Sequence, residues 1–267
     1  MGERLKVDYQ KKIFGVAPGD FERESLLRLL DKQKGRILDF GCGLGKLTKT
    51  VKGSRSDLEV YGCDIGKEAI RMAKKDPQGV SFMIGKSERL PFRNGFFDAV
   101  YARHVLEHLE ELDAAMVEIR RVLKKNGCFY SITPLEGSSF TLEYWSRKNK
   151  FIRQAREKYT GHVSAFSFKG LKEIIEKNRF SVKSYFFGEF FLYQLIDCLY
   201  FPFLVFLRKD FSFSFRGNYI MAKKSGFKRW LVLTIKTALE EVFKAENIFW
   251  QKLRAPGFIV YIRAVKT

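Results

Sequence analysis

A short glycine-rich segment is the part of this sequence whose residue types and spacing best suit ligand binding. Residues 37–45 read ILDFGCGLG, a short apolar strand followed by a G-x-G-x-G turn. Glycine lets the backbone turn sharply and approach a ligand closely, and the N-terminus of a following helix offers free N–H groups. A dinucleotide fingerprint would need a third glycine where Lys46 stands, and no mononucleotide P-loop sequence follows. The segment therefore predicts a nucleoside-containing ligand other than a dinucleotide or a P-loop nucleotide. The alternative is a tight strand-to-helix turn that binds no ligand.

Two acidic residues narrow the choice of ligand. Asp64 closes the second predicted strand, where a carboxylate can accept both hydrogen bonds from a ribose diol. Asp39 lies just before the glycines and can either orient the loop or meet a ligand ammonium group. A ligand with an amino-acid end, a ribose and no phosphate suits this set. S-adenosylmethionine (SAM) is such a ligand.

Five segments in a fixed order resemble the class I SAM-dependent methyltransferases, in particular the small-molecule group called type 11. They are ILDFGCGLG at 37–45, GCDIGKEAI at 62–70, GKSERLPFRNGFFDAV at 85–100, HVLEHL at 104–109 and RRVLKKNG at 120–127. Any one segment is weak, but together they are specific. The resemblance implies an α/β fold with a Rossmann-like, doubly wound sheet of seven strands, mostly parallel with an antiparallel last strand. It also implies methyl transfer from SAM.

The resemblance assigns cofactor-binding roles to several residues. Gly41 and Gly43 line the methionine portion of SAM, and Asp64 holds the ribose. The adenine is assigned to Ile65, which packs on its face, and to Ser87 and Glu88, which lie beside its edge. Arg103 is assigned to the methionine portion or the sulfonium. The chain departs from the family at Lys86, where an acceptor for the adenine amino group is common, because lysine cannot accept a hydrogen bond.

The three histidines leave the question of a catalytic base open. His104 and His108 are four residues apart, but no H-E-x-x-H spacing or third ligand is apparent, so we expect no metal site. His108 reads as a half-buried structural residue. His104 and His162 are candidates for substrate contact, His162 equally for loop hydrogen bonding. Methyl transfer from a sulfonium depends largely on positioning, and a base is needed only if the acceptor must lose a proton.

The elements that must hold these residues alternate between strand and helix. Strands are expected at 36–40, 58–63, 80–84, 97–102 and 128–133, and helices at 20–34, 46–51, 67–75 and 114–124. This alternation indicates a parallel sheet with helices on both faces, and ligands in such folds lie beyond the carboxyl ends of the strands. A helix at 167–178 and strands at 180–187 and 257–266 follow. We therefore predict a SAM-binding core of residues 1–188 and 257–267, with a helical insertion at 189–256.

Charge and aromatic content set the second half of the chain apart. The net charge is +19, with 25 Lys and Arg against 19 Asp and Glu in residues 1–134 and 24 against 11 in residues 135–267. The apolar stretch 190–207 is interrupted by Gln194, Asp197 and Pro202, which disfavours a membrane span. Basic residues beside aromatic ones suit anionic lipid headgroups. The insertion is thus expected to be a lid over the substrate, an anionic membrane contact, or both.

The sequence supports three functions. The favoured one is methyl transfer from SAM to a small or lipid-linked acceptor. The first alternative is an RNA methyltransferase, which the positive net charge favours although the sequence contains no separate RNA-binding module. The second is a non-catalytic scaffold that binds SAM. Four dispersed cysteines and the absence of an apolar leader fit a cytoplasmic protein, peripheral on the inner face of a membrane if the insertion contacts lipid. The acceptor and the oligomeric state are not specified by the sequence.

Overall fold

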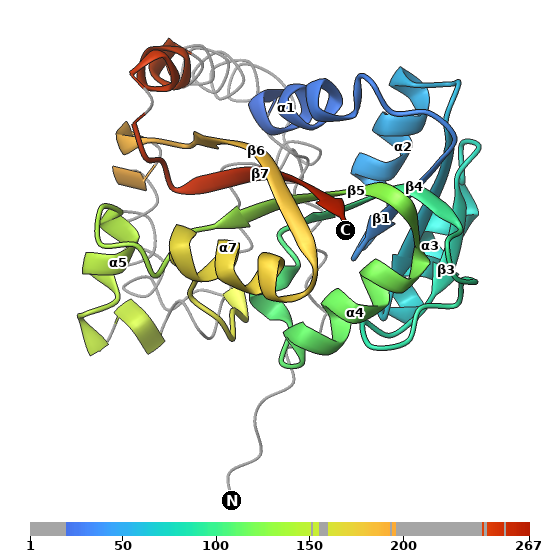
Figure 1. Ribbon diagram of the computed structural model, residues 1–267. Helices are drawn as coiled ribbons and strands as arrows, with labels where there is room; N and C mark the ends of the chain where they lie inside the picture. The colour runs from blue at the N-terminus through green and yellow to red at the C-terminus, as the bar shows by residue number, and fades with distance from the viewer. Residues whose placement is uncertain are drawn as a thin grey trace, which may run out of the picture.

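The fold is built on one seven-stranded sheet with the order β3-β2-β1-β4-β5-β7-β6 (Figure 1). The computed structural model describes residues 20–150, 152–154, 160–192, 194–195, 242, 245–253 and 255–267. The pairs β1–β2, β2–β3, β1–β4 and β4–β5 are parallel, whereas β7 is antiparallel to both β5 and β6. This is the predicted Rossmann-like sheet with an antiparallel last strand.

Most strand boundaries follow the short apolar runs of the sequence, but β5 begins at Leu123, five residues before the strand expected at 128–133, and the helix expected over 114–124 ends at Val122. The strands are β1 (Arg36–Phe40), β2 (Glu59–Asp64), β3 (Ser81–Ile84), β4 (Phe97–Arg103), β5 (Leu123–Pro134), β6 (Phe180–Gly188) and β7 (Ile259–Lys266). The helices are α1 (Asp20–Leu30), α2 (Lys46–Ser54), α3 (Lys67–Lys75), α4 (Leu112–Val122), α5 (Leu142–Ser146) and α7 (Phe168–Lys177), with a short 3₁₀ helix η1 (Leu106–His108).

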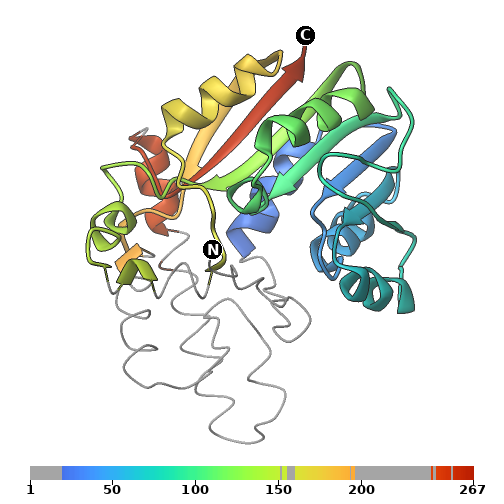
Figure 2. The ribbon, with the colours of Figure 1, turned by 90° about the horizontal axis from the view of Figure 1, so that it is seen from below.

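Alternate residues of the central strands point to two separate cores. Ile37 belongs to the core beneath α1, α2 and α3, and its neighbour Leu38 belongs to the core beneath α4 and α7. Figure 1 shows α1 and α2 on one side of the sheet and α4 and α7 on the other, and Figure 2 looks onto the latter face. Because side chains alternate between the faces of a strand, a sheet covered on both sides needs apolar residues at nearly every position.

The first helix is shorter than its apolar pattern predicts. A helix was expected over 20–34, but α1 ends at Leu30. The guanidinium of Arg55 donates hydrogen bonds to the carbonyl oxygens of Leu30 at 2.6 Å, Asp31 at 2.9 Å and Gln33 at 2.7 Å. The Leu30 carbonyl also accepts from the N–H of Gln33 at 2.9 Å, and the last carbonyls of a helix need such partners from outside it. Arg55 therefore supplies a helix end that no local sequence signal indicates.

Most of the predicted insertion at 189–256 lies outside the described residues. Its two ends are described, and there the backbone N–H of Glu189 donates to Asn247 Oδ1 at 2.8 Å and that of Leu192 to Glu246 Oε1 at 2.8 Å. The predicted lid or membrane element therefore stays a prediction. Within the described part of the chain, no helix combines the length and apolar character needed to cross a bilayer.

Candidate active site

The glycine loop lies between β1 and α2 and is held by the end of β2. The N–H groups of Gly41 and Cys42 donate to the carbonyl oxygen of Cys63 at 2.8 and 3.1 Å. Gly41 and Gly43 have φ values of +79° and +52°, which side chains other than glycine rarely adopt. A Cβ on Gly41 would lie 2.4 Å from Val105 Cγ2, whereas one on Gly43 would meet nothing within 4 Å. The loop is thus packed on one side and open on the other.

Asp64 fixes the open side of this loop. Its Oδ2 accepts a hydrogen bond from the N–H of Gly43 at 2.8 Å, and its Oδ1 accepts one from the N–H of Gly66 at 2.7 Å. Each carboxylate oxygen has a further lone pair. The side chain therefore joins the ends of β1 and β2 and keeps acceptor capacity for a diol.

Asp39 lies buried beneath the glycine loop and holds it in place. It is 4% exposed, and its Oδ2 accepts a hydrogen bond from the hydroxyl of Thr48 at 2.6 Å, which ties β1 to the first turn of α2. Burial raises the pKa of Asp39 to about 6, although the Thr48 hydrogen bond acts in the opposite direction. Of the two roles considered for Asp39, this geometry favours orientation of the loop.

The residues assigned to adenine lie on the adjoining surface. Ile65 follows Asp64 and is 64% exposed, so it offers an uncovered apolar face. Ser87 donates a hydrogen bond to Glu88 Oε2 at 2.7 Å. The backbones of Lys86 and Arg89 form an isolated antiparallel β-bridge. Because β3 ends beside Asp64 in the sheet, the loop after β3 lies at the same edge. The fold brings these residues together with Asp64.

Arg103 and His104, at the end of β4, are engaged with a carboxylate from α1. Arg103 Nε donates to Glu22 Oε2 at 2.8 Å, and His104 Nε2 lies 2.8 Å from Glu22 Oε1. His104 also lies 3.2 Å from Glu107 Oε1, and its φ of +51° is left-handed. Burial lowers the pKa of His104, but the charge of Glu22 and the hydrogen bonds with Glu107 and Glu22 outweigh it and raise the pKa to about 9.

The contacts of His104 with Glu22 and Glu107 affect whether His104 can act as a catalytic base. A ring with a pKa of about 9 is protonated at neutral pH and has no lone pair with which to accept a proton. His104 therefore suits a positioning role better than that of a general base. Glu22 was not singled out from the sequence, because a glutamate in an amphipathic helix gives no local sign of a partner 81 residues away.

His162 lies at the same edge of the sheet, beyond β5. Its Nδ1 is 2.7 Å from Glu136 Oε1, and Glu136 also forms an ion pair with Arg147. Its ring meets that of His108 edge to face, with centroids 4.8 Å apart. His108 Nδ1 in turn lies 3.1 Å from the carbonyl oxygen of Gly161. The structure therefore joins two histidines that are far apart in the sequence.

The two cysteines beside the glycine loop, Cys42 and Cys63, are not activated thiols. Burial raises the pKa of the Cys42 thiol and raises that of Cys63 to about 12, so neither is a ready nucleophile.

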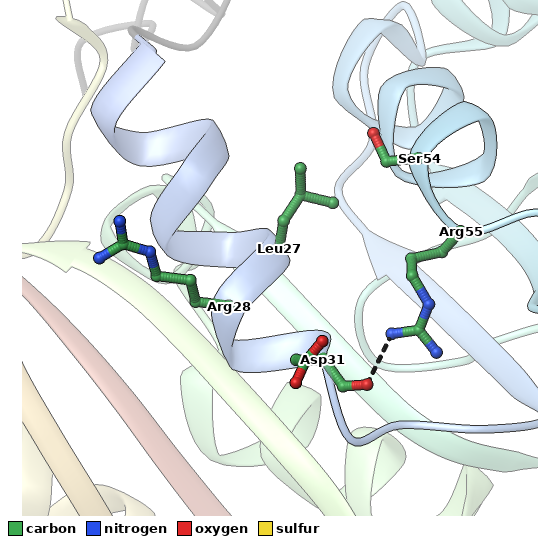
Figure 3. Close-up of a pocket in the computed structure, with 5 residues that line it drawn as sticks. All are labelled: Leu27, Arg28, Asp31, Ser54 and Arg55. Atoms are coloured by element: carbon green, nitrogen blue, oxygen red, sulfur yellow. Dashed lines mark hydrogen bonds between the residues drawn. The ribbon is translucent and has the colours of Figure 1, made fainter.

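A pocket between α1 and α2 lies around the Arg55 guanidinium (Figure 3). Its lining residues are Leu27, Arg28, Asp31, Ser54 and Arg55. Since α2 ends where β2 begins, this pocket is at the amino edge of the sheet, opposite the glycine loop.

Comparison with known proteins agrees with this geometry. Residues 38–131 match the methyltransferase domain family. A demethylmenaquinone methyltransferase of Chlorobaculum tepidum is 32% identical over 108 residues, which are 40% of this chain and 44% of that protein. An O-methyltransferase of Penicillium expansum is 36% identical over 108 residues, 38% of this chain and 39% of that protein. The chain thus spans less than half the length of these relatives. Its residues 38–131 are thus similar to a methyltransferase domain, and its sheet has the Rossmann-like topology of the class I methyltransferases.

Solved structures extend the likeness to the whole fold. A SAM-dependent methyltransferase of Thermotoga maritima matches with a TM-score of 0.57 at 18% identity, covering 92% of this chain and 88% of that one. The [4+2]-cyclase SpnF matches with a TM-score of 0.55 at 16% identity, covering 92% of this chain and 80% of that one. At such identities the likeness concerns the fold alone. Since a cyclase shares it, the reaction has to be argued from the site.

Proposed function

We propose that this chain transfers a methyl group from SAM to a small or lipid-linked acceptor. The proposal rests on the hydrogen bond between the N–H of Gly43 and the carboxylate of Asp64. This bond holds the open side of the glycine loop beside a carboxylate, at the ends of the neighbouring strands β1 and β2. These groups fit SAM: Gly43 leaves room for the methionine portion, Asp64 can accept from the ribose hydroxyls and exposed Ile65 can pack against adenine. SAM bound there would supply an electrophilic methyl group on a sulfonium.

The chain's own task is then to position and to shield the reactants. The oxygens of Asp64 are already oriented by two N–H groups, so little ordering is left for the ribose contact. Adenine cannot be held by the Lys86 side chain as an acceptor, which leaves backbone groups or the neighbouring Ser87 and Glu88. Holding donor and acceptor in line accounts for much of the acceleration of such a displacement.

The acceptor is proposed from the relatives and from the charge. Relatives are named for a quinone-type acceptor, for O-methylation and for a malonyl acyl-carrier protein. The excess of basic residues in 135–267 favours an amphiphilic acceptor reached at an anionic membrane surface. The same charge favours RNA as the second candidate acceptor.

One incubation separates these acceptors. The full chain is incubated with SAM labelled on its methyl group and with either a lipid extract or total RNA. We expect label in the lipid fraction, and a product that disappears in the Asp64→Ala variant. Label confined to RNA would replace the proposed acceptor, and absence of label together with absence of SAM binding would overturn methyl transfer itself.

The membrane contact has a separate test. Sedimentation with vesicles of anionic phospholipid should remove the chain from solution at low salt, and vesicles of zwitterionic lipid should not. Because exposed charges are screened with a Debye length of about 3 Å at 1 M salt, binding should fall steeply as salt is added. A chain that stays in the supernatant with anionic vesicles at low salt has no such contact.

A further inference from the structure

Three side chains that the cofactor site does not use gather at the carboxyl edge of the sheet. Glu107 and His108 come from η1, and His162 comes from the loop before α7. One potential ligand atom from each residue lies within 4.8 Å of those from the other two. Two imidazoles and a carboxylate form a donor set with a known preference for transition metals.

Each imidazole is held so that one nitrogen is left over. The carbonyl oxygen of Gly161 can only accept, so His108 Nδ1 donates to it and carries the ring's proton. His162 Nδ1 donates to Glu136 in the same way. A metal ion binds the neutral form of a ring, in which Nε2 then keeps its lone pair. Metal-binding histidines are commonly oriented in this manner, by a carbonyl or a carboxylate on the other nitrogen.

Glu107 supplies the observation that points to a ligand. The residue is 0% exposed, and its Oε2 has no hydrogen-bond partner within the described part of the chain. A buried carboxylate oxygen without a partner is costly. A cation between Glu107 and the two rings would remove that cost.

We propose that Glu107, His108 and His162 bind one divalent transition-metal cation, of the group Zn²⁺, Mn²⁺, Fe²⁺ and Co²⁺. Mg²⁺ and Ca²⁺ prefer oxygen donors and do not suit two imidazoles. Zinc lies about 2.1 Å from a histidine nitrogen, so two donors on one ion are at most about 4.2 Å apart. The candidate ligand atoms lie within 4.8 Å of one another, so a pair at that limit must close by several tenths of an ångström to share one ion.

The place of the cation gives it a role that rests on the proposed function. Val105, two residues before Glu107, packs against Gly41 of the glycine loop. Three protein ligands leave positions open for an acceptor oxygen, and a bound hydroxyl loses its proton to solvent more readily. The oxygen's electron pair would then form the bond to the methyl carbon, while the carbon–sulfur bond breaks and sulfur keeps its pair. The cation thus favours a hydroxyl-bearing acceptor.

The same contacts have a competing explanation, in which these residues only hold η1 and the loop before α7 together and bind no metal. The carbonyl oxygen of Glu107 accepts hydrogen bonds from the N–H groups of Val163 and Ser164 at 2.9 and 3.1 Å, so η1 already holds this loop. A purely structural cluster would stabilise the loop and have no affinity for ions. Metal binding by the purified chain distinguishes the two.

The experiment is calorimetric titration of chelator-treated full chain with Zn²⁺ in the absence of SAM. We expect one ion per chain, at least about 100-fold weaker binding in His162→Gln and Glu107→Gln, and about 10-fold weaker binding in Glu136→Gln, which weakens only the orientation of His162. Glu111→Gln, an exposed carboxylate at the start of α4, is the matched control and should bind like the wild type. Co²⁺ should give a visible spectrum that His162→Gln loses.

Two results would overturn the metal site. One is no saturable Zn²⁺ binding by the wild type. The other is binding that persists in His162→Gln and Glu107→Gln but is lost in Cys42→Ser, which would assign the ion to that half-buried thiol. SAM binding is measured on the same samples. Zn²⁺ binding without SAM binding would refute the proposed function and keep the metal site, and the reverse would refute the metal site alone.

Discussion

The carboxylate of Asp64 accepts a hydrogen bond from the backbone N–H of Gly43 at 2.8 Å, so the residue proposed to hold the ribose also shapes the glycine loop. Asp64→Ala should therefore weaken SAM binding by about 2–4 kcal/mol, or roughly 30- to 1,000-fold, since hydrogen bonds to charged groups contribute about 1.5–3 kcal/mol each. Calorimetric titration with SAM measures the change. A Kd within a few-fold of the wild type would remove Asp64 from the site.

The control for this variant is Asp76→Ala. Asp76 is an exposed aspartate just after α3, 4.0 Å from Lys49. Exposed pairs of this kind contribute about 0–1 kcal/mol to stability. Asp76→Ala should bind SAM normally. Urea unfolding of both variants checks that loss of binding is not loss of fold.

A pair of glycine substitutions separates loop geometry from helix propensity. Gly41→Ala places a Cβ 2.4 Å from Val105 Cγ2 at a φ of +79°, so we expect a loss of about 1–3 kcal/mol. Gly53→Ala lies in α2, where a Cβ meets nothing within 4 Å, and should stabilise by about 0.5–1 kcal/mol. Urea unfolding measures both. Equal effects of the two changes would contradict the described contact of Gly41 with Val105.

Local pattern was enough to predict the sheet. Strand ends at Phe40 and Asp64 follow from short apolar runs that stop at a glycine or an acid, and neighbouring parallel strands bring those ends together. The glycine loop, Asp64 and Ile65 could be placed for that reason. All three depend on contacts between segments adjacent in the fold and close in the chain.

Contacts over long sequence separations could not be predicted. Glu22 meets Arg103 and His104 across 81 and 82 residues, and Glu136 meets His162 from another loop. A histidine's partners depend on which loops cross the strand ends, and no periodicity reports that. The expectation of no metal site had the same origin, because it considered only ligands spaced along one segment. The proposed site departs from it.

The raised pKa of Asp39 predicts a pH-dependent stability. Its pKa rises from 3.8 to about 6 on folding because burial disfavours the charged form. A raised value means that the folded chain holds its proton longer than the unfolded chain. The contribution to the free energy of unfolding is therefore largest below pH 3.8 and is lost as the pH rises to about 6, by about 3 kcal/mol in all.

Asp39→Asn tests this prediction, because asparagine keeps an acceptor for Thr48 and cannot ionise. Urea unfolding at steps from about pH 4 to pH 8 gives the difference in stability between variant and wild type. That difference should grow in favour of the variant as the pH rises through the window and then level off. Thr48→Val, which removes the hydroxyl and keeps the carboxylate, should leave the pH dependence in place. A pH-independent difference for Asp39→Asn would show that Asp39 does not titrate as described.

The Glu22 carboxylate predicts how firmly α1 is attached to the sheet. It is 2% exposed and faces two cations, Arg103 and His104, across distances of 2.8 Å. Glu22→Gln leaves both cations with less opposing charge in a buried place, and breaking a buried pair costs about 3–5 kcal/mol. We expect a loss of about 3 kcal/mol in the free energy of unfolding. Glu24→Gln, on the same helix turn and only partly buried, should change stability by less than about 0.5 kcal/mol. Hydrogen exchange should show faster exchange in α1 for Glu22→Gln alone, and equal protection in the two variants would mean that α1 is held by its apolar face instead.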